Sequence, residues 1–339
     1  MDIQKLQQTA QAMVASGKGI LAIDESHSTC KKRFEALGVV SSEENRRHYR
    51  GLLVTAPNIE NYVSGMILFD ETLRQATDEG KSYSQVLTDK GIMPGIKVDT
   101  GAKPLALHDG EFVTEGLDNL RDRLEEYKSL GARFAKWRAV ITIGDNMPSN
   151  ACVVVNAHAL ARYAALCQEA DIVPMVEPEI LIDGDHTLER CYEVTTQVYQ
   201  ELFTQLREQG VLLEGTILKT SMVISGTKNS HQCSPTEVAE WTVKCLKENV
   251  PSELAGVVFL SGGMTNIQST ENLNEMNKIG GTPWPLSFSY GRAIQQPALE
   301  LWAEDMQGNY EEAQHQLVHR AKMNAMASLG QYTTDMENE

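Results

Sequence analysis

Three lysines stand inside apolar runs that otherwise have the composition of buried strands. Lys97 lies in GIKVD, Lys136 in FAKWRAV and Lys219 in TILKTSM. A single lysine near a strand end often reaches solvent along its apolar stem, but lysine is seldom fully buried without a partner. A lysine beside other cations in a dry pocket has a lowered pKa, and its free amine attacks carbonyl carbons. The three lysines therefore indicate Schiff-base chemistry.

Residues two apart on a strand share a face, and four runs present polar pairs of this kind. The pairs are Lys136 with Arg138, Glu177 with Glu179, Lys219 with Ser221, and Ser287 with Ser289. Two carboxylates in different environments supply the proton transfers that carbinolamine and enamine intermediates need. We therefore expect the glutamates to lie beside the lysines, together with Asp24 and Ser261.

Two glycine-containing segments are candidate anion sites. Backbone N–H groups of Ser261-Gly262-Gly263 are able to form a nest, and Arg292 follows Tyr290-Gly291. Neither segment is specific alone. Together they match the phosphate site that barrels often build from the loops after strands seven and eight.

Eight short apolar runs must position these residues. They end near Asp24, Asp70, Asp99, Val140, Ile180, Met222, Gly262 and Gly291. Segments of helical period lie between them, among them 117–130, 157–170, 186–209 and 235–248. This alternation predicts an α/β fold with a parallel sheet, and eight strands close a (β/α)8 TIM barrel. A doubly wound sheet is the alternative, but no glycine-rich turn follows the first run.

No linker divides the 339 residues, so we expect a single domain spanning 1–339. A helix of about 1–16 would precede a barrel of about 17–296, and closing helices with a short polar tail would fill about 297–339.

Composition limits the partners. Lys plus Arg number 30 and Asp plus Glu 46, a net charge of −16, which disfavours nucleic acid and membrane surfaces. The six cysteines include no C-x-x-C pair, and no signal peptide or membrane span is visible, so we expect a cytoplasmic protein. The only helically spaced histidine pair, His315 and His319, is interpreted as surface, so no metal site is expected.

The stretches LAIDES, ENRRHYRGLL, GIKVDTG, FAKWRAV, VEPEI, ILKTSMV, FLSGG and SFSYGRA follow in this order between about residues 20 and 295. In them the chain resembles the class I fructose-bisphosphate aldolases, and its short tail resembles the bacterial members. The resemblance implies a (β/α)8 barrel, no metal or other cofactor, and a homotetramer. It also implies reversible cleavage of fructose 1,6-bisphosphate to dihydroxyacetone phosphate and glyceraldehyde 3-phosphate in glycolysis and gluconeogenesis.

The resemblance also assigns roles to the catalytic candidates. Lys219 matches the Schiff-base lysine and Glu177 the general acid/base, which Glu179 would assist. Lys136 matches the lysine that helps to lower the pKa of the Schiff-base amine. Asp24 matches the carboxylate that handles the proton of the C4 hydroxyl.

The resemblance further implies a set of substrate-binding residues. Those at the C1-phosphate end are Ser261, Gly262, Ser289, Gly291 and Arg292; those at the C6-phosphate end are Ser26, Thr29 and Arg33; Lys97 and Arg138 line the sugar cleft, with Arg46 a weaker candidate.

Two features depart from the family pattern. The family commonly has Thr-Gly-Ser after the first serine of the loop, where this chain has His27-Ser28-Thr29, although Thr29 keeps a hydroxyl at the aligned place. Animal members also carry a long tail ending in a catalytic tyrosine. This chain stops soon after Gln331-Tyr332-Thr333, so we expect a carboxylate or water to take that role.

Other readings remain open at this point. A metal-dependent aldolase would need a histidine cluster, which the scattered histidines do not form. Transaldolase and deoxyribose-phosphate aldolase share the imine but lack two phosphate sites, and a non-catalytic scaffold would have lost site residues. The sequence does not decide between fructose and sedoheptulose bisphosphates.

Cys30, in the loop after the first strand, raises a hypothesis of redox control.

Overall fold

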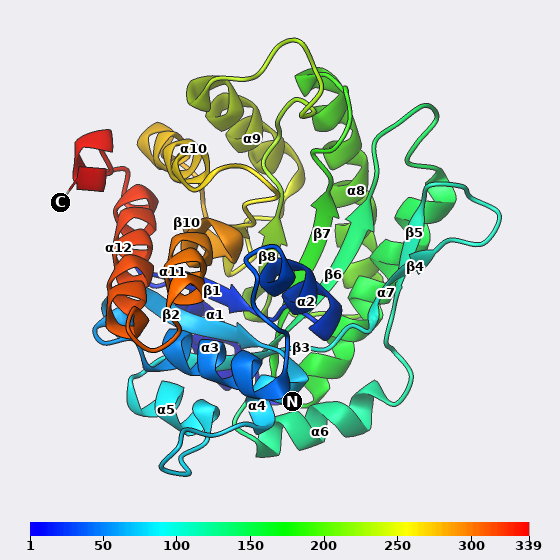
Figure 1. The fold of residues 1–339 in the computed structure, drawn as a ribbon. Helices are drawn as coiled ribbons and strands as arrows, with labels where there is room; N and C mark the ends of the chain where they lie inside the picture. The colour runs from blue at the N-terminus through cyan, green and yellow to red at the C-terminus, as the bar shows by residue number, and fades with distance from the viewer. Residues whose placement is uncertain (339) are drawn as a thin grey trace.

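The structure, a computed structural model, describes residues 1–338 and contains a closed barrel of eight parallel strands (Figure 1). The barrel strands are β1 (Gly19–Ile23), β2 (Val63–Leu68), β3 (Met93–Lys97), β6 (Phe134–Ile141), β7 (Val173–Ile180), β8 (Ile217–Thr220), β9 (Gly256–Phe259) and β10 (Leu286–Tyr290). They pair in this order, and β10 closes the sheet on β1 through Ile20 opposite Ser289. The predicted (β/α)8 barrel is confirmed, and each strand ends within three residues of its predicted position.

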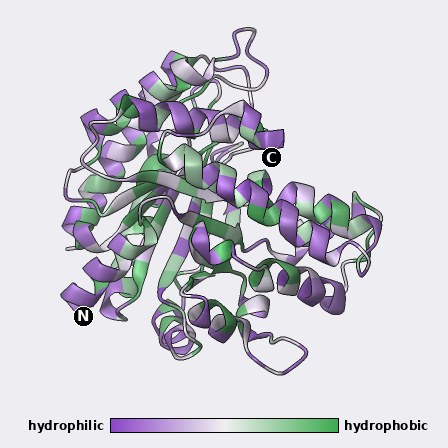
Figure 2. Ribbon diagram, turned by 90° about the vertical axis from the view of Figure 1, so that its left-hand side faces the viewer, coloured by the Kyte–Doolittle hydropathy of each residue, from purple (hydrophilic) through white to green (hydrophobic). Residues whose placement is uncertain are grey.

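Helices surround the barrel and precede it. They are α1 (Ile3–Met13), α2 (His27–Glu35), α3 (Glu43–Thr55), α4 (Asp70–Arg74), α5 (Tyr83–Asp89), α6 (Leu120–Ser129), α7 (Asn150–Glu169), α8 (Leu188–Glu208), α9 (Pro235–Asn249), α10 (Asn266–Ile279), α11 (Arg292–Glu304) and α12 (Tyr310–Ser328). Three 3-10 turns complete the structure: η1 (Ile59–Asn61), η2 (Leu213–Gly215) and η3 (Thr334–Asn338). The central strands consist largely of hydrophobic residues, whereas each surrounding helix contains both hydrophobic and hydrophilic residues (Figure 2).

The structure differs from the expected elements in three places. An antiparallel hairpin of β4 (Gly101–Pro104) and β5 (Phe112–Glu115) follows β3, and its short, partly exposed strands lack the apolar run that marks the others. Helix α7 begins at Asn150, earlier than predicted, because Ser149 caps it. The closing helices begin at Arg292, not 297, and α11 includes Pro297, whose missing N–H removes one helical hydrogen bond.

The segment expected to be a polar tail is packed where it is described. Tyr332 is buried, and its hydroxyl donates to Glu337 at 2.8 Å. Glu337 also forms an ion pair with the buried Arg320 of α12. Residue 339 lies outside the described residues. This segment is therefore held against α12 by charge as well as by burial.

The barrel interior changes from apolar to polar along its axis. At the end where the strands begin, α1 contributes Leu6 and Met13 to a core cluster with Phe134 of β6 and Ile217 of β8. The Phe134 ring requires glycine at position 95, since a Cβ there would lie 2.2 Å from it. The opposite end of the interior, where the strands finish, carries the polar residues.

Candidate active site

A cavity of about 500 Å³ opens where the barrel strands end. Every predicted site residue except Arg46 lines it. These residues are Asp24, Ser26, Thr29, Arg33, Lys97, Lys136, Arg138, Glu177, Glu179, Lys219, Ser261, Gly262, Ser289, Gly291 and Arg292. The volume lies within the usual range for small-molecule sites.

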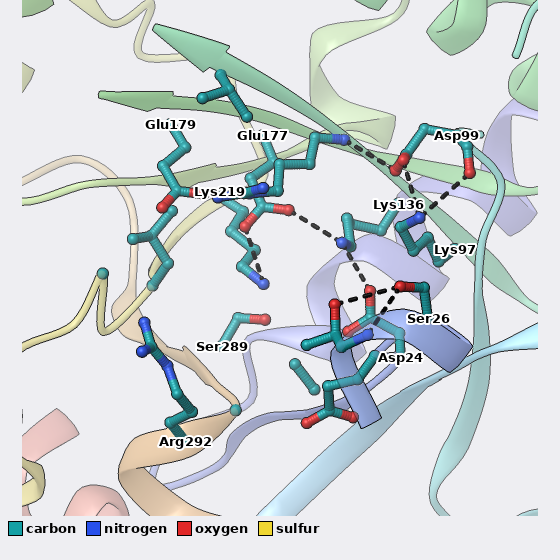
Figure 3. Close-up of a pocket in the computed structure, with 18 of the residues that line it drawn as sticks. Asp24, Ser26, Lys97, Asp99, Lys136, Glu177, Glu179, Lys219, Ser289 and Arg292 are labelled. Carbon is teal, nitrogen blue, oxygen red and sulfur yellow. Dashed lines mark hydrogen bonds and ion pairs between the residues drawn. The ribbon is translucent and has the colours of Figure 1, made fainter. Parts of the chain in front are cut away.

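Two lysines and two carboxylates alternate at the centre of the cavity (Figure 3). Lys219 Nζ lies 3.1 Å from Glu177 Oε1, and Glu177 Oε2 lies 3.3 Å from Lys136 Nζ. Lys136 Nζ then lies 2.7 Å from Asp24 Oδ2. Lys136, Glu177 and Lys219 are buried, so these charges interact in an environment that water screens poorly.

Strand register brings this group together. Lys136, Glu177 and Lys219 come from the consecutive strands β6, β7 and β8, whereas Asp24 follows β1 on the other side of the barrel. Arg138 pairs in register with Glu177, and Lys97 of β3 with Lys136. Because inward-facing residues recur every second position, Lys136 and Arg138 both reach the cavity, as do Glu177 and Glu179. Ser221 and Ser287 do not line it, since their hydroxyls donate to the backbone carbonyls of Ile180 and Lys18.

Electrostatics keep the central carboxylates ionised at neutral pH. Burial alone would raise the pKa of Asp24, but Lys136 and Lys219 outweigh it and lower the pKa to about 2. The pKa of Glu177 is also lowered, because the attraction of Lys136 and Lys219 exceeds the cost of burial. Burial opposes charge on Lys136, yet Asp24 and Glu177 raise the pKa of this lysine well above its usual value. Lys136 is thus a cation at neutral pH.

A second layer of ion pairs lies beside the first. Arg138 pairs with Glu179, and Lys97 Nζ lies 2.9 Å from Asp99 Oδ1. The buried Asp99 carboxylate also accepts the backbone N–H of Gly101 at 3.1 Å, which fixes the start of the β4–β5 hairpin. The motif GIKVD placed Asp99 at a strand end, and that position was the signal for its role here.

The C1-phosphate candidates form one end of the cavity. Gly262 and Gly263 have φ of +57° and +102°, a conformation that turns backbone groups toward a common point. Ser289 is buried, and its hydroxyl has no hydrogen-bond partner among the described residues. Arg292 begins α11, so the positive end of that helix also faces this end of the cavity.

The C6-phosphate candidates form the other end. Ser26 caps α2, and its hydroxyl lies 3.0 Å from that of Ser28 and 3.2 Å from that of Thr29. The unusual loop sequence therefore still gathers hydroxyl groups at the start of α2. Arg33, two turns into α2, is paired with Glu25, a cavity residue that was not among the predicted site residues. The lining also includes Lys32 and Ala102, which no motif marked.

Two candidates have surroundings that change their interpretation. Arg46 is not part of the cavity lining, because Glu71 holds its guanidinium through two hydrogen bonds of 2.8 and 2.6 Å. Cys30 is buried and accepts a hydrogen bond from Arg50, and burial raises the pKa of its thiol. It therefore lacks the exposed thiolate character of redox-sensing cysteines.

Across residues 1–338, no group of three or more His, Cys, Asp or Glu side chains is arranged to hold a metal ion. In the same residues, no helix is long and apolar enough to cross a bilayer.

Known proteins are similar to this chain in sequence and in fold. The family model "Glycolytic: Fructose-bisphosphate aldolase class-I" matches residues 5–339. The chain belongs to the class I fructose-bisphosphate aldolases. A probable fructose-bisphosphate aldolase class 1 of Xanthomonas campestris is 62% identical over 332 residues, which cover 98% of this chain and 99% of the relative. The fructose-bisphosphate aldolase of Dictyostelium discoideum is 48% identical over 328 residues, which cover 96% of this chain and 92% of the relative.

Solved aldolase structures have the same fold. A co-crystal structure of the Plasmodium falciparum fructose-bisphosphate aldolase, in complex with TRAP and a small-molecule inhibitor, superposes with a TM-score of 0.96. It is 44% identical and covers 97% of this chain and 95% of its own. As a class I aldolase, the chain is a lyase that cleaves fructose 1,6-bisphosphate reversibly through a lysine Schiff base, without a metal.

Proposed function

We propose that Lys219 forms the Schiff base and that Glu177 and Asp24 carry the protons of the aldol cleavage. The observation that carries this assignment is the position of the Glu177 carboxylate between two ammonium groups, 3.1 Å from Lys219 and 3.3 Å from Lys136. Lys219 supplies the nucleophilic amine. Asp24 and Glu177 hold Lys136 as a cation.

The reaction begins when Glu177 takes a proton from Lys219, which leaves a free amine. That amine attacks the C2 carbonyl of the open-chain sugar, and a C–N bond forms. The resulting carbinolamine loses its hydroxyl as water, with a proton returned by Glu177, and becomes an iminium ion. Glu177 thus serves in turn as base and acid.

Cleavage follows at the bond between C3 and C4. Asp24 takes the proton of the C4 hydroxyl, the C3–C4 electron pair moves into the iminium to give an enamine, and glyceraldehyde 3-phosphate departs. Lys136 stays within 2.7 Å of Asp24 and stabilises its anionic form before the proton arrives. A carboxylic acid group or water protonates the enamine at C3, and water then hydrolyses the imine and releases dihydroxyacetone phosphate. Glu179 is paired with Arg138 and lies two residues after Glu177 on β7, where it assists Glu177.

The two ends of the cavity bind the two phosphates in this proposal. The C1 phosphate lies against Ser261, Gly262, Ser289, Gly291 and Arg292, and the C6 phosphate against Ser26, Thr29 and Arg33. The same two ends would hold sedoheptulose 1,7-bisphosphate, which we propose as a second substrate. The proposed setting is the cytoplasm, which agrees with six cysteines that form no disulfide. A homotetramer, the usual assembly implied by the family resemblance, is the proposed assembly.

The imine assignment is tested by borohydride reduction in the presence of dihydroxyacetone phosphate. We expect a stable adduct on Lys219, identified by mass spectrometry of the digested protein, and its loss in Lys219→Arg together with activity. Lys228→Arg is the matched control, since this exposed lysine lies on the loop that follows β8. An active protein whose adduct forms on another lysine would exclude Lys219 as the nucleophile.

A further inference from the structure

A buried glutamine joins the segments that carry the two phosphate-facing arginines. Gln295 lies in the first turn of α11, three residues after Arg292, and is fully buried. Its Nε2 donates to the carbonyl of Ala22 on β1 and to Glu25 Oε1 at 3.0 Å. Its Oε1 accepts the hydroxyl of Tyr49 at 3.1 Å. Each polar atom of this side chain is therefore committed to a protein contact.

The same network surrounds Arg33. Its Nη1 donates to Glu25 Oε1 and, at 3.4 Å, to Gln295 Oε1, while its Nη2 donates to Gln296 Oε1 at 3.2 Å. Arg50 donates to the other oxygen of Glu25 at 2.6 Å. One carboxylate thus serves two guanidinium groups, and the cluster of three charges carries a net charge of +1.

Arg33 keeps one unsatisfied donor within this cluster. Its Nε is buried and has no hydrogen-bond partner among the described residues, although both terminal nitrogens are used. The side chain also lines the cavity, as Arg292 does. A surplus positive charge on a side chain that lines the cavity favours an anionic ligand.

We propose that Gln295 is a positioning residue that sets how strongly the substrate's second phosphate binds, because it fixes Arg33 relative to Arg292. This inference rests on the proposed function, in which Arg33 meets the C6 phosphate. Gln295 contacts the arginine of one phosphate end and belongs to the helix that begins at the other. Without its amide, only Glu25 and Gln296 orient Arg33, and the guanidinium turns further onto the Glu25 carboxylate and away from the phosphate.

The test compares two inert ligands, a hexitol 1,6-bisphosphate and the hexitol 1-phosphate, by isothermal titration calorimetry. Neither contains a carbonyl, so neither forms an imine. In Gln295→Met, which keeps the side-chain length but removes the amide, we expect the bisphosphate to bind about tenfold more weakly, the usual effect of losing a charge-assisted hydrogen bond. The monophosphate should change less than twofold.

Two further variants sharpen the comparison. Gln296→Met removes the Nη2 contact at a partly exposed position, so it folds readily and should weaken bisphosphate binding in the same direction by a smaller factor. Gln314→Met is the matched control, because Gln314 is a buried glutamine that ties α12 to Leu52 and Thr55 of α3. It should leave both affinities unchanged.

The outcomes separate the inference from the proposed function. Equal weakening of both ligands in Gln295→Met, or no change in either, would overturn the positioning role, as would an unaffected bisphosphate in Gln296→Met. Absence of a borohydride adduct on Lys219 in the unmutated chain counts against the proposed chemistry alone, because hexitol binding requires no imine.

Discussion

At the scale of single residues, charge pairing decides what the central lysines do. The sequence marked Lys136 and Lys219 as cations in apolar runs, and predicted that each would influence the other. The structure inserts a carboxylate, Glu177, between them, and adds Asp24 from the far side of the barrel. Residue type and a spacing of two were visible along the chain. The alternation of charges was not, because it depends on which strands face one another across the interior.

Glu177→Gln tests this alternation directly. The amide keeps the size of the side chain but cannot exchange a proton or balance two ammonium groups. Since the pKa of Glu177 is lowered by Lys136 and Lys219, the wild-type group is ionised at neutral pH and is able to accept the proton of Lys219. We expect kcat to fall by about 10² to 10⁴, the usual contribution of general acid–base catalysis.

Steady-state kinetics and the rate of borohydride trapping measure this effect, and both should fall in the variant. Glu193→Gln, on the exposed face of α8, serves as the control and should keep full activity. A Glu177→Gln protein that traps substrate at the wild-type rate would show that another group prepares Lys219.

At the scale of elements, backbone hydrogen bonds join the loop after β7 to the loop after β8. We call this contact the loop clamp. The backbone N–H of Gly226 donates to the carbonyl of His186 at 2.8 Å, and that of Lys228 donates to the carbonyl of Gly184 at 2.8 Å. His186 is buried in the first loop, and this burial lowers its pKa, so the ring is neutral at pH 7. The eight strands were predictable from their apolar runs. This loop clamp was not, because backbone hydrogen bonds leave no mark on residue type.

Gly226→Ala should open the clamp. A Cβ at this position would lie 2.4 Å from the carbonyl oxygen of Gly184, and backbone atoms yield little to such a contact. We expect the free energy of unfolding to fall by about 1–3 kcal/mol, as in other overpacked sites. Activity should fall as well, since the loop continues from the strand that carries Lys219.

Urea denaturation and kcat/KM report these two effects, with Thr227→Ala as the control at the exposed neighbouring position. If Gly226→Ala matched this control in both measurements, the two loops would have to move independently.

At the scale of the whole molecule, we propose that residues 1–339 form a single domain, because the eight strands close into one barrel. The charge of −16 lies on a molecule whose cavity gathers Lys97, Lys136, Arg138, Lys219 and Arg292. Composition excluded polyanions as main partners by the average charge. It did not reveal a local concentration of cations, because average charge contains no information on position.

The acidic surface also makes a prediction about the proposed tetramer. Four chains of 37.5 kDa give a mass of about 150 kDa. Because each chain carries −16, subunits repel one another, and salt screens this repulsion over about 8 Å at physiological ionic strength. We expect light scattering to give about 150 kDa at 0.15 M salt. At 0.01 M salt the tetramer should dissociate at a higher protein concentration on dilution. A mass of one chain at micromolar concentration and 0.15 M salt would exclude the tetramer.

The pairing of β1 with β10 also determines when the barrel closes during synthesis of the chain. Ser287 of β10 donates to the carbonyl of Lys18, a contact that spans 269 residues of sequence. While a ribosome is still translating the middle of the chain, β1 has β2 on one side and an open edge on the other. Unpaired strand edges promote aggregation, so the nascent chain is vulnerable for most of its translation. Asp24 stands next to that edge, and its enclosure, like that of the whole cavity, awaits the last barrel strand.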